Sequence, residues 1–221
     1  MKTYGCIDDC LDQKIFDELV QVGNLVPYLS GDNKQYTHIL NQYQFHSLRW
    51  RFGFDAVEEG VGIYWTDSCD LRPQLTYPIF LSNNNNISNE LYTQFYMRIL
   101  YFILDKHFDT NQIGKEIDVR RIKINLGTKA PSKLKHLVPH KDELVHHLSM
   151  TLMIGQSDGD HIVFEETDTY LRKKQSKDLT VLDQYKHKNN RLVYNFGHYH
   201  CNYDPVEHDF RLVINFVVNL R

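Results

Sequence analysis

A histidine and an aspartate at alternate positions, His140 and Asp142, are the side chains of this sequence whose types and spacing best suit a metal ion. In an extended strand, residues i and i+2 point to the same face, so this imidazole and this carboxylate would converge on one point. A second histidine from a distant strand would complete a two-histidine, one-carboxylate triad. Such a triad leaves three adjacent coordination positions open on an octahedral Fe(II) ion, enough for a chelating cosubstrate and O2.

The same spacing occurs a second time, at His107-Phe108-Asp109. That copy lies at the end of a segment with helical periodicity, where residues two apart point in different directions. We therefore expect the first copy to bind a metal and the second to be unrelated to it.

The candidates for the third ligand, His198 and His200, lie in a histidine-rich segment that reads as strand, glycine turn and strand. Because they are two residues apart, they could lie on the same face of a strand, and either could point toward the metal. Arg211 follows the turn at Asp204-Pro205 and opens a further strand. An arginine can form two parallel hydrogen bonds with a carboxylate, as a lysine cannot, so Arg211 is a candidate partner for the far carboxylate of 2-oxoglutarate.

The elements that would position these residues are predicted to be strands in the second part of the chain. Residues Arg120–Leu126 alternate between polar and apolar, as in a strand. Further short β segments are expected at Leu148–Ile154, His161–Glu165, Arg191–Phe196, Tyr199–Tyr203 and Phe210–Val218, separated by turns such as Ser157-Asp158-Gly159-Asp160. A series of this kind favours a sandwich or a jelly roll.

The first part of the chain, residues 1–115, is predicted to be helical and irregular. A helix with Phe16 and Leu19 on its apolar face follows Asp12, and a second carries Phe95 and Ile99 at helical spacing. We expect a single domain over residues 1–221, with these helices packed on one sheet of a β core at residues 116–221.

Composition sets limits on the partners of the chain. The 25 Lys and Arg against 28 Asp and Glu give a net charge of −3, which offers no support for generic nucleic-acid or membrane binding. The most apolar window, Phe95–Leu104, is short and contains Arg98, so it is not expected to span a bilayer. With no signal peptide and no CxxC among 4 cysteines, we expect a reduced, cytoplasmic protein, in the host cytoplasm if it is phage-encoded.

Several of these motifs together resemble the prolyl-4-hydroxylase-like branch of the 2-oxoglutarate/Fe(II)-dependent dioxygenases, and the likeness is strongest to small members from phage and marine genomes. The motifs are Pro139-His140-Lys141-Asp142, the turn at Ser157–Asp160 with Phe164, Arg191-Leu192-Val193, His200, Pro205 and Arg211. The resemblance covers residues Ile122 to Phe216. It implies a double-stranded β-helix, the jelly roll of cupin-like proteins, with the metal inside.

The resemblance also implies an activity and its cofactors. A hydroxylase of this family uses Fe(II), 2-oxoglutarate and O2, with ascorbate as a possible support, and couples decarboxylation to succinate and CO2 with oxidation of a substrate C–H bond. The spacing of His200 from Pro205 and Arg211 suits the family better than that of His198. Halogenating relatives lack the carboxylate, so Asp142 favours hydroxylation.

The sequence departs from the family at one position that bears on cosubstrate binding. Many prolyl-hydroxylase-like members present a tyrosine to 2-oxoglutarate on the strand after the metal motif, where this chain has Met153. Asn125 or Thr151, on flanking strands, could supply the hydrogen bond instead, and Tyr194 is a further option.

Two other functions remain open from the sequence. A cupin-like metalloprotein would bind a metal without 2-oxoglutarate, and a non-enzymatic jelly-roll module would bind no metal. For the oxygenase, the primary substrate is unidentified. In such enzymes the N-terminal extension and the loops at the barrel mouth select the substrate. The family resemblance makes a prolyl residue or an amino acid the leading expectation, with a modified nucleobase or a small metabolite as alternatives.

Overall fold

A computed structural model describes residues 2–22, 51–53, 74–82, 90–109, 113, 116–129, 139–143, 145–165 and 179–220. Its elements, in chain order, are β1 (Tyr4–Ile7), α1 (Gln13–Val22), β2 (Arg51–Gly53), β3 (Gln74–Leu81), α3 (Glu90–His107), β4 (Ile117–Thr128), β5 (His147–Ile154), β6 (His161–Phe164), β7 (Val181–Tyr185), β8 (Arg191–Phe196), β9 (His200–Asn202) and β10 (Phe210–Leu220). Among these residues no helix is long and apolar enough to cross a membrane.

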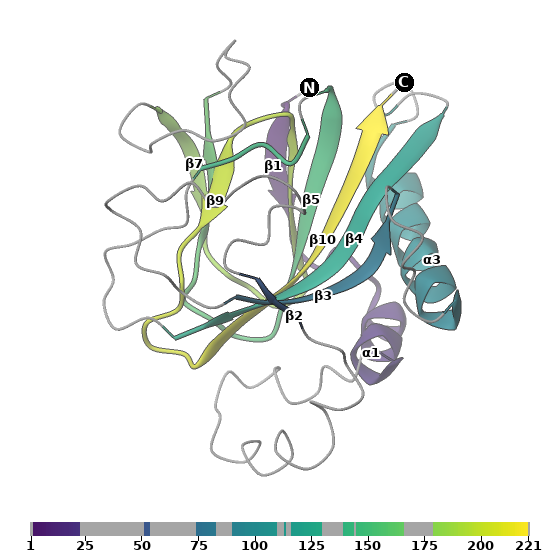
Figure 1. The fold of residues 1–221 in the computed structure, drawn as a ribbon, viewed down its shortest axis with the longest axis horizontal. Helices are drawn as coiled ribbons and strands as arrows, with labels where there is room; N and C mark the ends of the chain where they lie inside the picture. Colours follow the sequence, from purple (N-terminus) through teal and green to yellow (C-terminus); the bar gives the residue numbers. More distant parts are fainter. Residues whose placement is uncertain are drawn as a thin grey trace.

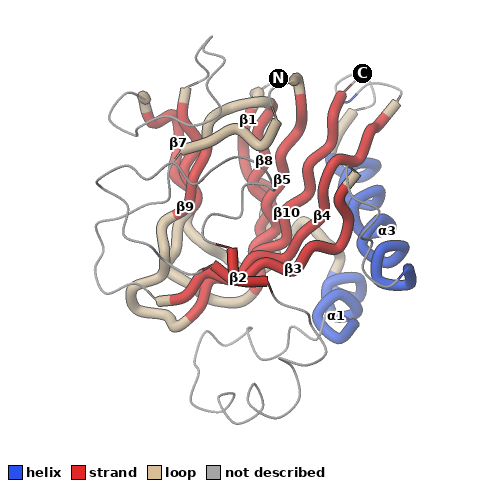
Figure 2. The backbone as a smooth tube through the Cα atoms, in the orientation of Figure 1, coloured by secondary structure: helices blue, strands red, loops and turns tan. Residues whose placement is uncertain are grey.

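The strands form two antiparallel sheets (Figures 1 and 2). The large sheet has the order β1-β8-β5-β10-β4-β3-β2, and the small sheet has the order β7-β6-β9. An apolar cluster joins the two sheets: Met153, Val163, Tyr185, Val193 and Val213. Two facing antiparallel sheets whose strands cross over in this way are a jelly roll, so the predicted fold class is confirmed.

The outer face of the large sheet is apolar and lies against the helices, which Figure 1 shows on one side of that sheet. Alternate residues of the three central strands are buried there: Ile122, Ile124 and Leu126 on β4, Leu148, Met150 and Leu152 on β5, and Leu212, Ile214 and Phe216 on β10. Phe16 and Leu19 of α1 and Ile99 and Ile103 of α3 belong to the same cluster. The helices expected to pack on one sheet therefore do so.

The inner face of the same sheet, which points toward the small sheet, buries polar and charged side chains beside the apolar residues of the cluster that joins the two sheets. It carries Arg121, Lys123 and Asn125 on β4, Ser149 and Thr151 on β5, and Arg211 and Asn215 on β10. Strand alternation produces this division, because neighbouring residues of a strand point to opposite faces.

The first part of the chain differs from the expectation of helices and irregular structure alone. It also supplies β1, which pairs with β8 at one edge of the large sheet, and β3 with β2, which extend the other edge beyond β4. β1 is too short for its alternation to be recognised in the sequence. That residues 1–221 form a single domain stays a prediction.

Candidate metal centre

His140 and His200 are joined by backbone hydrogen bonds, and their rings are also close together. The N–H of each donates to the carbonyl of the other, both at 3.0 Å, in an isolated antiparallel bridge beside β9. Their ring centroids lie 4.7 Å apart. The segment that carries His140 and Asp142 is thereby attached to the edge of the small sheet, as the strand argument requires.

The side chains of His140, Asp142 and His200 offer three potential ligand atoms that all lie within 4.8 Å of one another. Asp142 Oδ1 is 4.0 Å from His140 Nε2, and Asp142 Oδ2 is 3.4 Å from His200 Nε2. The side chains of Asp142 and His200 are each 2% exposed, whereas His140 is 12% exposed. Two imidazoles and one carboxylate grouped in this way fit a divalent ion such as Fe(II).

His198, the alternative third ligand, lies elsewhere. Its Nε2 is 2.8 Å from the hydroxyl of Thr3, and its ring meets Tyr4 edge-on. The second His-x-Asp copy is also remote from the cluster, because His107 ends α3 and its Nε2 lies 2.7 Å from the carbonyl of Cys10. Of the histidines weighed in the sequence, the structure therefore brings only His140 and His200 to Asp142 among the residues it describes.

The carboxylate of Asp142 is buried between two donors. Arg121 Nη2 donates to Oδ1, and the hydroxyl of Ser149 donates to Oδ2. Burial by itself would raise the pKa of Asp142, but Arg121, followed by His200 and His140, holds that pKa well below its ordinary value. Asp142 is therefore ionised at neutral pH, as a metal ligand must be.

Arg211 lies near the start of β10 with 3% of its surface exposed. Its Nε donates to the carbonyl of Gly159 at 2.9 Å, and its Nη2 donates to Asn202 Oδ1 at 2.7 Å. Burial lowers the pKa of Arg211 to about 10, so the group stays charged at neutral pH. Both bonds use one edge of the guanidinium, and a carboxylate that approaches end-on would meet the two terminal nitrogens.

The predicted turn after β5 fixes the position of Arg211. The carboxylate of Asp158 accepts hydrogen bonds from the backbone N–H groups of Val206, Glu207 and His208, at 2.9 to 3.2 Å. Although burial opposes the change, these bonds lower the pKa of Asp158 to about 2. The loop that leads into β10 is thus attached to the turn that supplies the carbonyl of Gly159.

His161 and Asn202 are site residues that the sequence analysis missed. The ring of His161 lies parallel to that of His200, with centroids 5.4 Å apart and an interplanar angle of 15°. His161 Nδ1 is 2.8 Å from Asn202 Oδ1, the atom that also accepts a bond from Arg211. Burial, with the charges of His200 and Arg211, holds the pKa of His161 well below its ordinary value. The only signal in the sequence was that His161 begins an expected strand.

Asn125 and Thr151 both lie on the inner face, but they are joined through a residue that the sequence analysis did not single out. Asn215 Oδ1 accepts from Asn125 Nδ2 at 2.8 Å, and Asn215 Nδ2 donates to the hydroxyl of Thr151 at 3.0 Å. Met153 belongs to the apolar cluster between the sheets. Tyr194 lies on the outer face, where it packs against the ring of Phe108, so it is excluded as a cosubstrate contact.

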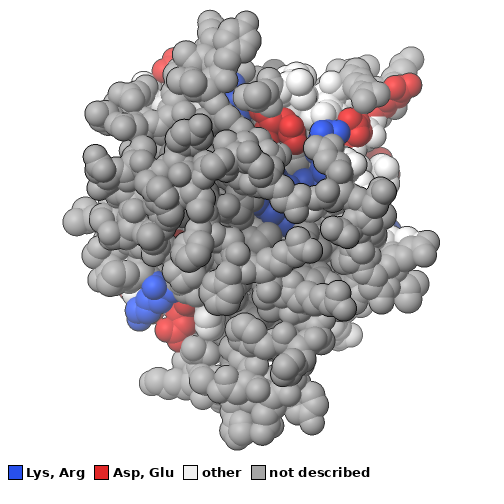
Figure 3. All heavy atoms as spheres, viewed as in Figure 1, with Lys and Arg blue, Asp and Glu red and all other residues white. Residues whose placement is uncertain are grey.

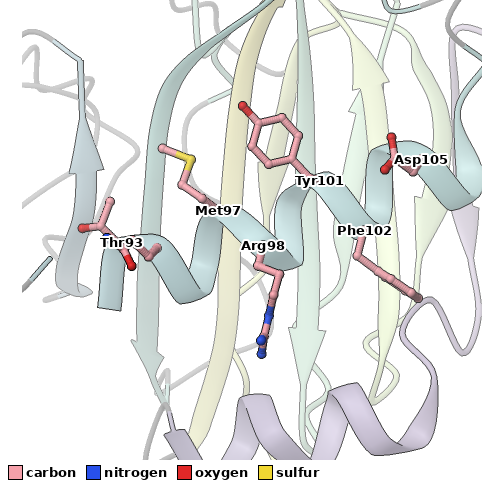
Figure 4. A pocket seen from close by; sticks show the side chains of 7 residues that line it. Thr93, Met97, Arg98, Tyr101, Phe102 and Asp105 are labelled. Carbon is pink, nitrogen blue, oxygen red and sulfur yellow. The ribbon is translucent and has the colours of Figure 1, made fainter. Parts of the chain in front are cut away.

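Among the described residues, no other group of three His, Cys, Asp or Glu side chains is placed to hold a metal ion. A shallow hollow lies on the outside of α3, lined by Thr93, Gln94, Met97, Arg98, Tyr101, Phe102 and Asp105 (Figure 4). It is on the helix side of the large sheet, away from the inner face. On the face seen in Figure 3, described acidic and basic side chains lie next to each other near the upper edge and at the lower left.

No protein-family model and no curated protein matches the sequence. Solved structures do match. A 2OG-Fe(II) oxygenase family oxidoreductase from Burkholderia pseudomallei aligns with a TM-score of 0.53 and 12% identity, over 95% of this chain and 93% of that chain. A prolyl hydroxylase from Trichoplax adhaerens, solved with a hypoxia-inducible-factor peptide, aligns with a TM-score of 0.55 and 10% identity, over 99% and 84%.

The epimerase SnoN, solved with Fe3+ and alpha-ketoglutarate, aligns with a TM-score of 0.54 and 8% identity, over 98% of this chain and 78% of that chain. At identities this low, the structural alignments establish a common fold and nothing beyond it. The chain therefore has the jelly-roll fold of the 2-oxoglutarate/Fe(II) oxygenases, as the resemblance in its motifs implies.

Proposed function

We propose that this protein is a non-haem Fe(II)- and 2-oxoglutarate-dependent oxygenase, and specifically a hydroxylase. The observation that carries the proposal is the cluster of His140, Asp142 and His200 in the interior of this fold. The buried Arg211 is connected to this cluster through Asn202 and through His161, whose ring stacks on that of His200. An unrelated jelly roll has no physical reason to bury an arginine beside such a cluster, because burying a charge is costly unless it is paired.

His140, Asp142 and His200 would hold the iron. When bound, the iron supplies open adjacent positions at which a chelating cosubstrate and O2 can meet. In this chain the backbone bridge between the two histidines and the donors on Asp142 orient the ligand atoms, so little rearrangement is needed on binding.

Arg211 would pair with the far carboxylate of 2-oxoglutarate through the two terminal nitrogens of its guanidinium. Gly159 and Asn202 hold the adjacent edge of the same group, from Nε to Nη2, which fixes the plane of the guanidinium; Nη2 keeps its second N–H for the carboxylate. We propose that Asn125 and Thr151 replace the missing tyrosine, with Asn215 between them. Met153 and Val213, in the apolar cluster between the sheets, would exclude water beside the cosubstrate.

The primary substrate is proposed only by class. A prolyl residue or an amino acid is favoured by the motif resemblance, and the fold likeness to a prolyl hydroxylase is compatible with either. We further propose a cytoplasmic location, which rests on the sequence alone.

An anaerobic titration tests the proposed function. Fe(II) followed by 2-oxoglutarate is added to the purified protein, and the weak visible charge-transfer band of the chelate is measured. Asp142→Ala should abolish the band. Arg211→Ala should keep metal binding but require about tenfold to a hundredfold more 2-oxoglutarate, since a charge-assisted hydrogen bond contributes about 1.5–3 kcal/mol. His200→Ala should abolish metal binding, whereas His198→Ala should keep it.

The same titration separates the alternatives. Metal binding that is indifferent to 2-oxoglutarate and to Arg211 would point to a cupin-like metalloprotein. No metal binding would leave a non-enzymatic jelly-roll module.

A further inference from the structure

Two side chains from different strands hold Asp142, and neither belongs to the ligand cluster. Arg121 comes from β4 and Ser149 from β5, and both are paired across the same residue of β10, Val217. They therefore form one cross-strand row on the inner face. From that row, Arg121 donates to Oδ1 and Ser149 donates to Oδ2 of the carboxylate.

Each oxygen of Asp142 also faces one histidine of the cluster. Oδ1 lies 4.0 Å from His140 Nε2, and Oδ2 lies 3.4 Å from His200 Nε2. A carboxylate oxygen has two lone-pair sites, so it can accept a hydrogen bond and still bind a metal ion. Rotation of the carboxylate away from the histidines would break both hydrogen bonds, and the two donors together fix its orientation.

The burial and incomplete hydrogen bonding of Arg121 indicate a role at Asp142 rather than a contribution to stability. Arg121 is 6% exposed, and its buried Nε has no hydrogen-bond partner among the described residues. A buried guanidinium that leaves one donor unsatisfied is costly to fold, and a buried ion pair is poor support for stability. The same strand position would hold an apolar residue at lower cost.

We infer that Arg121 and Ser149 are positioning residues that orient Asp142 toward the metal and thereby set the affinity of the site for a divalent ion. The inference rests on the proposed function, because it takes the cluster to be a metal site. Neither residue is one of the three side chains that would hold the ion. Hydrogen-bond partners of metal ligands typically contribute about tenfold to a hundredfold to metal affinity.

Two substitutions that keep the net charge test the inference. Arg121→Lys keeps the cation but loses the planar fork, and Ser149→Ala removes the hydroxyl. Because the charge near the site is unchanged, an effect on the metal reports orientation rather than electrostatic attraction. Ser149→Thr restores the hydroxyl and is the matched control.

The measurement is a titration of each purified variant with Co(II), read from the visible spectrum, with thermal melting as a check on the fold. We expect Arg121→Lys and Ser149→Ala to raise the dissociation constant about tenfold to a hundredfold and to change the shape of the Co(II) spectrum. Ser149→Thr should retain the wild-type constant and spectrum.

Wild-type constants and spectra in both Arg121→Lys and Ser149→Ala would overturn the inference while leaving the proposed function intact. Should Arg121→Lys fail to fold, Ser149→Ala decides alone. A wild-type protein that binds neither Co(II) nor Fe(II) would overturn the proposed function, and the inference with it.

Discussion

On β4, β5 and β10, the residues that point away from the small sheet are apolar and lie beneath α1 and α3, whereas many of those that point toward it are polar or charged. Both sets are buried. Burial of an aliphatic or aromatic side chain stabilises the fold by about 1.5–3 kcal/mol, but burial of a polar group costs free energy unless a partner satisfies it.

The inner face meets this cost by pairing its groups with one another. Asn125, Asn215 and Thr151 form one hydrogen-bonded chain, and Arg121 and Ser149 both bind Asp142. The outer face therefore supplies most of the stability of the sheet. Burial of polar groups on the inner face costs part of that stability and holds those groups in fixed positions.

The largest effect is expected from a substitution on the outer face. Phe216→Ala removes a fully buried ring from the cluster beneath the helices and should lower the free energy of unfolding by about 3–5 kcal/mol, measured by urea denaturation. The adjacent residue, Asn215, points to the inner face and provides the matched variant.

Asn215→Ala leaves the partner groups of Asn125 and Thr151 unsatisfied and should cost about 1–3 kcal/mol. It should also weaken 2-oxoglutarate binding, which Phe216→Ala should not do under conditions where that variant is folded. Equal losses of stability in the two variants would contradict the division of roles between the faces.

A smaller loss of stability, with a specific loss of binding, is expected at the turn that holds Arg211. A Cβ at Gly159 would come within 2.6 Å of both Arg211 Cδ and the backbone carbonyl oxygen of Tyr203. Gly159→Ala should therefore displace Arg211, cost about 1–3 kcal/mol and raise the 2-oxoglutarate requirement in the anaerobic titration, with metal binding retained.

Gly127→Ala is the control for that variant. A Cβ at Gly127 would make only ordinary contacts, with Arg211 Cβ at 3.8 Å and Asp204 Oδ1 at 3.7 Å. Binding of 2-oxoglutarate should be nearly unchanged. If the two alanine variants behave alike, the fixed position of Arg211 does not matter for the cosubstrate.

The smallest effect, counted per pH unit, is expected from acid, which acts on titratable groups and not on the apolar cluster beneath the helices. His187 Nε2 donates to the carbonyl of Ile154 at 3.1 Å, and burial of its ring, with the charge of Arg211, lowers the pKa of His187 from 6.5 to about 3. The unfolded chain binds the proton more readily, so this contribution to stability is complete above pH 6.5 and is lost as the pH falls toward 3.

The slope should be up to about 1.4 kcal/mol per pH unit for this histidine. Urea denaturation at pH 7 and pH 5 measures it, and His187→Gln should reduce the loss between the two values. His146→Gln, at an exposed position, should leave the loss as in the wild type. If the free energy of unfolding of His187→Gln falls with pH as steeply as that of the wild type, protonation of His187 is not the cause of the acid destabilisation.

The ligand cluster could be predicted from the sequence because its information lies in residue types and short spacings. An extended segment is enough to place His140 and Asp142 on one face. His200 and Arg211 follow them in the order that the resembled family shows. Alternation over Arg120–Leu126 likewise predicted which residues of β4 would be buried on the apolar face.

The partners of those residues could not be predicted, because they depend on the register between strands that are distant in sequence. Arg121 meets Asp142 only because β4 and β5 flank β10 in one particular register. His161 lies beside His200 only because β6 pairs with β9. The strands β1, β2 and β3 were missed for two reasons. β1 and β2 are too short to show a period, and β3 lies at the end of an aromatic-rich stretch of sequence without a clean period.

The backbone bridge between His140 and His200 has a consequence for the kinetics of metal uptake. Bringing two ligands together across a long segment normally costs loop-closure entropy at the moment of binding. Here two N–H···O=C hydrogen bonds have already closed that loop during folding. An arriving ion meets the imidazoles as a ready pair, and its association rate should be set by the stripping of its own hydration shell rather than by a search of the chain.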